Sequence, residues 1–392
     1  MIVSPDKCLY KFRDLTLTMF LFIVLVSCNH AGENLSDKKS DDREEFIKSA
    51  GRLKLEKENG YTIVTVINPW QGAKGVNQPY FLVKRGTELP EGIDTSSVVT
   101  VPIRKIICMS TTHIAMISAL GEENSIAGVS GTGFPYSKTL NESIEKGLVA
   151  DVGYEANLNK ELILTISPDL VMMYGIGSES NSYIGKIREL GIAVLFNADY
   201  LETDPLAKAE WIKLFGALYC KESLADSIYN SEVEIYNNLK SFISGNTAVR
   251  PKVLLGLPFR DIWYISPGNS FISKLIEDAG GEYLWRNTKS SVSMPYGLEN
   301  VYINALLADY WLNIGTVKSI DEISVVDPRL NDLPCFRKGN LYNNNKRLTM
   351  NGGNDYWESG ALYPHLILND IAAILHPDLF PEYELFYYRR IN

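Results

Sequence analysis

Cysteine is scarce in this sequence of 392 residues, which contains five: Cys8, Cys28, Cys108, Cys220 and Cys335. They are too widely spaced to form a disulfide framework or pairs at metal-binding intervals. Cys108 and Cys220 lie among apolar neighbours, so we predict that both are small buried residues. Whether any two of Cys108, Cys220 and Cys335 form a disulfide remains open at this stage.

Histidine is also rare, and His30, His113, His365 and His376 are scattered along the chain. The sequence has no HExxH, no GxSxG and no phosphate-binding Walker loop, so it lacks the usual signatures of zinc proteases, serine hydrolases and P-loop NTPases. An enzyme that uses carboxylates distant in sequence, such as a secreted hydrolase, stays open. The net charge of -9 and the absence of a basic stripe argue against a nucleic-acid partner.

Long apolar runs are limited to one, from Leu15 to Val26. At about 12 residues it is too short to span a membrane, and it follows three basic residues, as in a secretory signal. The residues "LVSC" that end at Cys28 resemble a bacterial lipobox, in which the cysteine is lipidated. We therefore predict an exported lipoprotein that faces the periplasm or the extracellular side. An ordinary N-terminal membrane anchor is the alternative, and a start at Met1 or Met19 is left open.

The rest of the chain divides by pattern. Residues 29–50 are polar and charged and predict a flexible tether. Three β-rich runs between residues 61 and 102 predict a small antiparallel sheet. From residue 106 short apolar strands alternate with helices, which predicts a parallel sheet covered by helices, with ligands bound at the loops that follow the strands.

A different pattern follows at residues 204–245, where apolar residues recur at helical spacing after Asp204 and Pro205, a good helix start. One helix of about 40 residues would extend about 60 Å and could join two domains. Two helices that meet near Cys220 remain the alternative. The α/β alternation then resumes.

We predict a signal peptide at 1–28, a tether at 29–50, an N-terminal lobe at 51–203, a connecting helix at 204–245 and a C-terminal lobe at 246–392.

From about Ile106 to Tyr388 the chain resembles the substrate-binding proteins of bacterial ABC importers for iron complexes and cobalamin. The resemblance rests on the order and spacing of "KIICMSTTHIAMISALGEENSIAGVS", "VADVGYEANLNKELILTISPDLVMMYG", "DPLAKAEWIKLFGALYCKESLADSIY" and "NDYWESGALYPHLILNDIAAILHPDLFP". It implies an α/β fold of two Rossmann-like lobes joined by a long α-helix, with the N-terminal β strands as an extension. It also implies a monomer that binds cargo between its lobes and delivers it to a permease and its ATPase subunit.

The cargo implied is a ferric siderophore or haem, with cobalamin as the alternative, and no intrinsic cofactor is expected. Such chelates combine apolar faces with polar edges, so a cleft that binds them should offer aromatic rings and a few hydrogen-bond donors. The candidates in the first lobe are Ser110, Thr111, His113, Phe134, Tyr136, Tyr154 and Tyr174. Those in the second are Phe259, Arg260, Trp263, Trp285, Arg286, Tyr356, Trp357 and Glu358. Arg260 or Arg286 could pair with carboxylate or catecholate oxygens.

The resemblance also implies one surface carboxylate on each lobe for docking on the permease. By position these are Glu179 and either Asp321 or Glu322. A receptor for a bare divalent metal is a further alternative, which would need His113, His365 and a carboxylate to converge in space.

Overall fold

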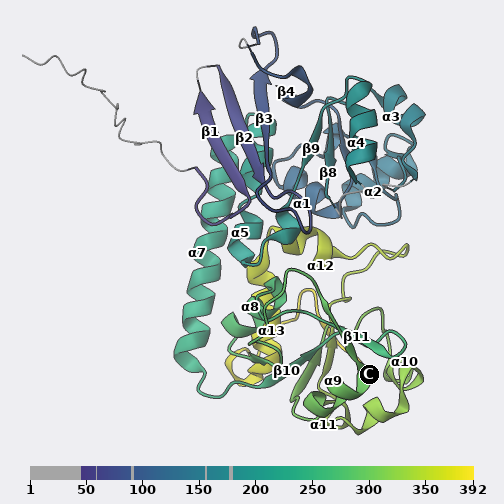
Figure 1. The fold of residues 1–392 in the computed structure, drawn as a ribbon. Coiled ribbons are helices and arrows are strands. Elements are labelled where there is room, and N and C mark those ends of the chain that lie inside the picture. The colour runs from purple at the N-terminus through teal and green to yellow at the C-terminus, as the bar shows by residue number, and fades with distance from the viewer. Residues whose placement is uncertain (1–45, 59, 90–91, 155–156, 176–179) are drawn as a thin grey trace, which may run out of the picture. The chain divides into compact units, whose positions relative to one another are not determined.

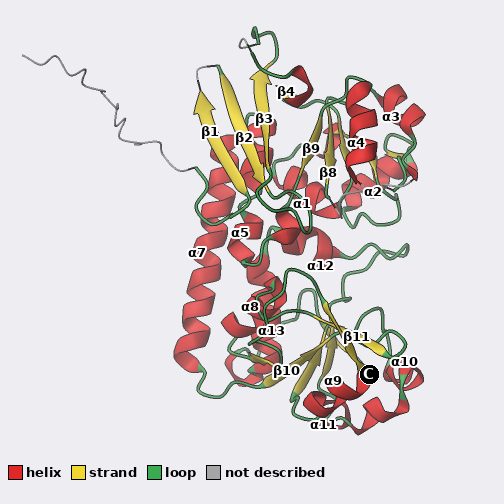
Figure 2. Ribbon diagram, in the orientation of Figure 1, coloured by secondary structure: helices red, strands yellow, loops and turns green. Residues whose placement is uncertain are grey.

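The computed structural model describes residues 46–392 apart from 59, 90–91, 155–156 and 176–179. The predicted signal and lipidation site, Cys28, therefore lie outside the described residues. Residues 45–392 form one compact unit. In this unit two sets of strands are each flanked by helices (Figure 2). Among the described helices, none is both long and apolar enough to cross a membrane.

The first sheet of the unit is β1 (Leu53–Glu58), β2 (Tyr61–Ile67), β3 (Asn77–Lys84) and β4 (Val98–Val101), in that order. Strands β1, β2 and β3 are antiparallel neighbours, whereas β4 runs parallel to β3. The prediction of a purely antiparallel sheet is thus wrong for β4. The chain from β3 to β4 is long enough to return to the starting end of the sheet before β4 begins.

The N-terminal lobe contains a five-stranded parallel sheet in the order β7-β6-β5-β8-β9. Its strands are β5 (Ile106–Cys108), β6 (Ile126–Val129), β7 (Ala150–Asp151), β8 (Leu170–Met173) and β9 (Val194–Phe196). The helices are α1 (Thr111–Ala119), α2 (Lys138–Glu145), α3 (Lys160–Ile166) and α4 (Ser180–Glu189). Strands β5, β8 and β9 are buried at every position, as expected for a sheet covered on both faces.

The C-terminal lobe repeats this plan with a sheet in the order β12-β10-β14-β15-β16. Strands β10 (Lys252–Leu255), β12 (Glu282–Tyr283), β14 (Tyr310–Leu312) and β15 (Leu341–Asn343) are parallel, and β16 (Arg389–Arg390) is antiparallel to β15. A separate antiparallel pair joins β11 (Ile262–Ile265) and β13 (Met294–Gly297). The helices in this half of the chain are α8 (Phe271–Asp278), α9 (Leu298–Ala305), α10 (Ile320–Val326), α11 (Pro334–Arg337), α12 (Asp355–Glu358) and α13 (Pro364–Leu375), of which α12 packs against α1 of the N-terminal lobe.

Residues 204–246 form three helices: α5 (Pro205–Ala209), α6 (Ile212–Leu218) and α7 (Glu222–Asn246). Asp204 caps α5 as predicted, because its Oδ1 accepts the N–H of Leu206 at 2.9 Å. Cys220 has a φ of 55° and lies in the left-handed region, which ends α6. The long connecting helix is therefore α7, with 25 residues and a length of about 38 Å, and it runs beside both lobes (Figure 1). Cys220 is exposed at this turn, so the prediction that it is buried is wrong; Cys108 is buried as predicted.

Two buried carboxylates hold the first described residues against the N-terminal lobe. Glu210 accepts the backbone N–H groups of Lys48, Ser49 and Ala50 at 2.9, 2.6 and 2.8 Å. Its Oε1 also lies 3.0 Å from Nζ of the buried Lys213. Glu202 accepts the N–H groups of the next two residues at 3.3 and 3.0 Å. The predicted tether of residues 29–50 is thus part of the folded unit from residue 46 onward.

This arrangement predicts that Glu210→Ala destabilises the protein strongly, since it leaves the buried Lys213 with only the more distant Asp226 carboxylate, at 3.7 Å, and three N–H groups without an acceptor. We expect the free energy of unfolding in urea to fall by about 3–5 kcal/mol. Glu234→Ala, at an exposed position of α7, is the matched control and should change it by less than about 0.5 kcal/mol. A loss below about 1 kcal/mol for Glu210→Ala would contradict this account.

Candidate functional site

A cavity of about 270 Å³ lies at the carboxyl ends of β5, β6 and β8 in the N-terminal lobe. From β5 the chain builds the sheet in one direction through β6 and β7, and then returns to the other side of β5 with β8. The switch point of the sheet therefore lies between β5 and β8, which is where open α/β sheets bind ligands. The described residues around the cavity are Cys108, Met109, Ser110, Thr111, Ile114, Val129, Ser130, Gly131, Phe134, Pro135, Tyr154, Tyr174, Gly352, Asn354 and Trp357.

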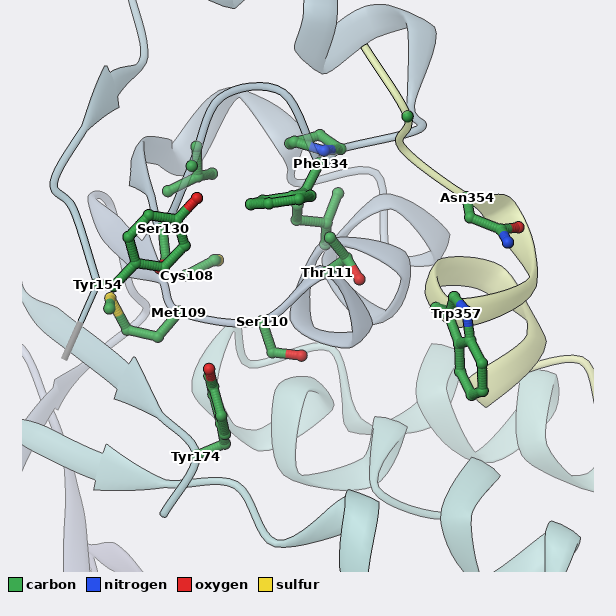
Figure 3. Close-up of a pocket in the computed structure, with 15 residues that line it drawn as sticks. Cys108, Met109, Ser110, Thr111, Ser130, Phe134, Tyr154, Tyr174, Asn354 and Trp357 are labelled. Carbon is green, nitrogen blue, oxygen red and sulfur yellow. The ribbon is translucent and has the colours of Figure 1, made fainter. Parts of the chain in front are cut away.

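The start of α1 forms one side of this cavity (Figure 3). Ser110 caps the helix, since its Oγ accepts the N–H of Thr112 at 3.3 Å and lies 3.1 Å from Oγ1 of the same residue. No acidic side chain occupies the first turn of α1, so its partial positive charge is not neutralised there. This edge of the cavity can therefore donate hydrogen bonds to a ligand oxygen.

Aromatic rings supply much of the remaining wall. Phe134 and Tyr154 make an edge-to-face contact with ring centroids 6.1 Å apart, and their side chains are 48% and 53% exposed. Trp357 is 58% exposed on the opposite side, and Tyr174 lies beside Ser110 in Figure 3. Large aromatic rings left this exposed beside a concavity form a surface ready to cover apolar faces of a ligand.

Gly131 allows these rings to approach the loop after β6. A Cβ at this position would lie 2.6 Å from Phe134 Cδ2 and 2.9 Å from the Tyr154 hydroxyl, and its φ of 82° disfavours other residues. Asp151, at the end of β7, fixes the same loop by accepting the N–H groups of Gly131, Thr132 and Gly153 at 3.1, 3.2 and 2.9 Å. Burial alone would raise the pKa of Asp151, but these hydrogen bonds outweigh it and lower the pKa.

One wall of the cavity comes from the C-terminal half of the chain. After β15 the chain leaves the C-terminal lobe, contributes Gly352 and Asn354 to the cavity and forms α12, which packs against α1. Asn354 Oδ1 caps α12 by accepting the N–H of Tyr356 at 3.0 Å, and Trp357 follows within the helix. The cavity is thus built by residues between Cys108 and Tyr174 together with residues between Gly352 and Trp357.

Six of the predicted ligand-binding residues lie together around this cavity: Ser110, Thr111, Phe134, Tyr154, Tyr174 and Trp357. The lining residues that were not predicted include Cys108, Met109, Gly131 and Asn354. The polar, glycine-rich run "NGGNDYWESG" was a usable signal for Asn354. The neighbouring small and apolar residues carry no signal of their own, because equivalent residues occur throughout both cores.

Three predicted positions near the cavity have structural partners instead. Glu358 is buried and accepts the backbone N–H groups of Tyr136 and Ser137 at 2.7 and 2.9 Å. The Tyr136 ring faces the guanidinium of Arg347 at 5.0 Å. Tyr356 is 3% exposed, and burial raises its pKa to about 12. None of the three borders the cavity among its described lining.

His113 is completely buried in α1, and its ring packs near that of Phe215 with centroids 6.2 Å apart. Neither ring nitrogen has a hydrogen-bond partner among the described residues. Burial lowers the pKa of His113 to about 3, so its ring is neutral at physiological pH. The structure therefore places it behind the cavity wall and not on its surface.

The predicted residues of the second lobe separate into core and surface positions. Trp263 is fully buried and donates from Nε1 to the Leu255 carbonyl at 2.9 Å, and Trp285 belongs to the same core. Arg286 forms an ion pair with Glu282 at 2.5 Å, beside a different, polar cavity of about 340 Å³. These three side chains are therefore occupied away from the cavity at α1.

Phe259 and Arg260 follow the carboxyl end of β10 in a different environment. The Phe259 side chain is 67% exposed, and the Arg260 guanidinium lies 5.3 Å from the centre of its ring. They do not border the cavity, but they lie on the edge of the C-terminal sheet from which the segment after β15 also departs. An aromatic face and a cation are thus available on the second lobe.

The predicted docking carboxylates are only partly described. Glu179 lies outside the described residues. Asp321 and Glu322 are exposed in the first turn of α10, where Glu322 Oε2 accepts the N–H of Lys318 at 3.0 Å.

In residues 46–392, with the gaps noted above, no group of three or more His, Cys, Asp or Glu side chains could hold a metal ion. The two histidines suggested for a metal site have different neighbours, since His365 Nδ1 lies 2.6 Å from Glu232 Oε2 and His113 packs near Phe215. The three described cysteines are free.

The chain belongs to the periplasmic binding protein family, whose model matches residues 106–343. This match confirms the resemblance found in the sequence, and the family is one of solute-binding transport proteins. An uncharacterized lipoprotein of Methanocaldococcus jannaschii is 28% identical over 357 residues, which cover 86% of this chain and 82% of the relative.

Solved structures show the same fold. A periplasmic haem-binding protein from Pseudomonas aeruginosa matches with a TM-score of 0.52 and 16% identity, covering 70% of this chain and 93% of its own. An ABC-type Fe3+-hydroxamate transport protein from Saccharomonospora viridis matches with a TM-score of 0.52 and 17% identity, covering 70% and 94%. The two-lobed α/β fold with a long connecting helix is thereby confirmed.

The burial of His113 predicts a loss of stability in acid. Because its folded pKa of about 3 lies below the ordinary value of 6.5, the unfolded chain binds a proton between these values that the folded chain does not. His113→Phe should remove this contribution. Between pH 7 and pH 4.5 we expect the unfolding free energy of the wild type to fall by about 2–3 kcal/mol more than that of the variant. Met116→Leu, on the same helix, is the non-titrating control, and parallel pH profiles for all three proteins would refute the prediction.

Proposed function

We propose that this protein is a lipid-anchored receptor that captures an iron complex between its two lobes and delivers it to an ABC permease. The observation that carries this proposal is the lining of the cavity at α1, which combines exposed aromatic rings with hydroxyl and amide groups. Such a surface suits a ligand with apolar faces and oxygen-rich edges. The volume of about 270 Å³ is slightly below the range of about 300–1,000 Å³ usual for ligand pockets, so a large chelate would extend from it toward the second lobe.

The charge of the lining favours one kind of iron complex. None of the described lining residues is charged, and the helix end at Ser110 offers only partial positive charge. Three hydroxamate groups neutralise Fe3+, whereas three catecholate groups leave a strongly negative complex that would need several cations. Of the two arginines among the predicted ligand-binding residues, Arg260 is the one that forms no ion pair in the described structure, so it is the candidate cation. The lining therefore supports a hydroxamate-type or other weakly charged complex over a tris-catecholate.

Cobalamin is the second candidate, because the corrin ring also presents broad apolar faces to aromatic side chains. The same rings that would cover an iron complex, Phe134, Tyr154 and Trp357, support it. A bare divalent metal is less well supported, since it needs carboxylate, imidazole or thiolate ligands and the described lining offers the single thiol of Cys108, whose pKa is raised above its usual value by burial. A secreted hydrolase has no specific observation in its favour.

Export, lipidation and docking complete the proposal. The predicted lipobox at Cys28 is supported by the relative described as a lipoprotein. The tether would end where Glu210 and Glu202 hold residues 48–52. Glu179 on the first lobe and Asp321 or Glu322 on the second remain the proposed contacts with the permease, at which exposed charges would mainly steer association.

The proposal is tested with the soluble form that starts after Cys28. The protein is incubated separately with a ferric hydroxamate, a ferric catecholate, haem and cyanocobalamin, and absorbance is recorded after gel filtration. We expect the ferric hydroxamate to co-elute with micromolar or tighter affinity. Co-elution of cyanocobalamin alone would establish the second candidate, and co-elution of none of the four would refute the class of cargo.

Trp357→Ala tests whether the cavity at α1 holds the cargo. Removal of an exposed ring that covers a ligand face should weaken binding by about 10–30-fold, measured by tryptophan fluorescence quenching or by absorbance titration. Phe242→Ala is the control, because this ring is similarly exposed but belongs to α7. Equal affinities for wild type and Trp357→Ala, with cargo bound, would place the binding site elsewhere.

A further inference from the structure

Glu358 connects two parts of the molecule that are distant in sequence. It comes from α12, which the chain reaches after leaving β15 of the C-terminal lobe. Its carboxylate accepts two consecutive N–H groups, those of Tyr136 and Ser137, which precede α2 of the N-terminal lobe. With an exposure of 4%, this carboxylate is sealed within the contact.

The contact determines where one wall of the cavity lies. Trp357 is the residue directly before Glu358, and Asn354 caps the same short helix. Both border the cavity at α1. A four-residue helix has little stability of its own, so its position depends on what anchors it. Release of Glu358 would therefore remove one of the contacts that hold the Trp357 wall against the N-terminal lobe.

The groups around Glu358 do not neutralise it. Asp355, on the same helix, carries like charge and forms its own ion pair with Arg347 at 2.5 Å. Glu123, from the turn before β6, also carries like charge, and its Oε1 accepts the hydroxyls of Ser118 and Ser137 at 2.5 Å.

The cations near this contact, Arg347 beside Tyr136 and Lys138 at the start of α2, do not form an ion pair with Glu358 in the described structure. The thiol of Cys108, at the end of β5, is buried, and burial followed by the charge of Glu358 raises its pKa, so it is uncharged. From α1, His113 is neutral. Tyr136, in the loop that donates to Glu358, has its ring against Arg347. In the described part of the chain no lysine, arginine or histidine forms an ion pair with Glu358.

Burial is the main cause that raises the pKa of Glu358, to about 7, and the charges of Asp355 and Glu123 add to it. The N–H groups of Tyr136 and Ser137 act in the opposite direction without cancelling it. When the contact opens, water reaches the carboxylate and its pKa returns toward the usual 4.5. The closed contact thus binds a proton that the open one releases, so closure is favoured below about pH 7 and weakened above it.

We propose that Glu358 is a positioning residue that fastens the Trp357 wall of the cavity to the N-terminal lobe, and that its ionisation loosens this fastening. The consequence for cargo binding rests on the proposed function, but the fastening itself does not. From the two pKa values, the ratio of closed to open contact should fall about tenfold between pH 6 and pH 8. The cavity would then be better formed in mildly acidic than in alkaline surroundings.

Hydrogen exchange of the soluble protein tests the fastening without any cargo. The protection factor of the peptide that contains Tyr136 and Ser137 is measured at pH 6 and pH 8, as a ratio to the intrinsic exchange rate at each pH. In the wild type we expect protection to fall about tenfold, whereas E358Q, which cannot ionise, should keep its value. E384Q is the matched control, since Glu384 is an exposed carboxylate and its variant should follow the wild type.

Unchanged protection in the wild type between the two pH values would overturn the proposal, and so would an equal fall in E358Q. The wild-type measurement decides the matter even if E358Q does not fold. Because no ligand is present, this result is independent of the cargo trials: a failed co-elution with a normal exchange profile would count against the proposed function alone.

Discussion

The direction of parallel strands is the constraint on which the rest of this structure depends. In each lobe β strands joined through helices run the same way, so the loops that follow them gather at one edge of the sheet. The segment after β15 leaves that edge of the C-terminal sheet and reaches the corresponding edge of the N-terminal sheet, where Asn354 and Trp357 border the cavity. The cavity at the edge of the N-terminal sheet is thereby bordered by residues from both halves of the chain.

The sequence predicted those features that local patterns determine. Short apolar strands followed by amphipathic helices gave the two α/β lobes, and the cap at Asp204 was located correctly. The same reasoning placed Ser110, Phe134 and Tyr174 at strand ends, and these residues do border the cavity. Both Trp263 and Trp357 were selected as candidates, but Trp263, within β11, is completely buried, whereas Trp357, in the polar glycine-rich run, is exposed at the cavity. The sequence left open whether residues 204–245 form one helix or two that meet near Cys220, and the left-handed backbone conformation at Cys220 produces the break.

The chain crosses between the lobes more than once, and this limits how they can move. Helix α7 is one connection, anchored to α13 through Glu232, which accepts the N–H of His365 at 3.0 Å. The segment from residue 344 to α13 is a second connection, and its Ala361 and Leu362 are buried in the core of the N-terminal lobe. A hinge built of several packed connections favours small displacements over wide opening. A largely preformed cavity then loses little conformational entropy when it binds its ligand.

Two buried carboxylates of this protein, Glu210 and Glu358, have different roles, which depend on the charged groups and N–H groups around them. Glu210 is accompanied by Lys213 and three N–H groups, so its charge is compensated and the contact can be permanent. Glu358 has two N–H groups and like charges nearby, so the same kind of contact is made at a cost that varies with pH. The compensated carboxylate fixes the first folded residues, which need not move. The uncompensated one lies beside the cavity wall, where a contact that can be released has a use in binding and delivering a ligand.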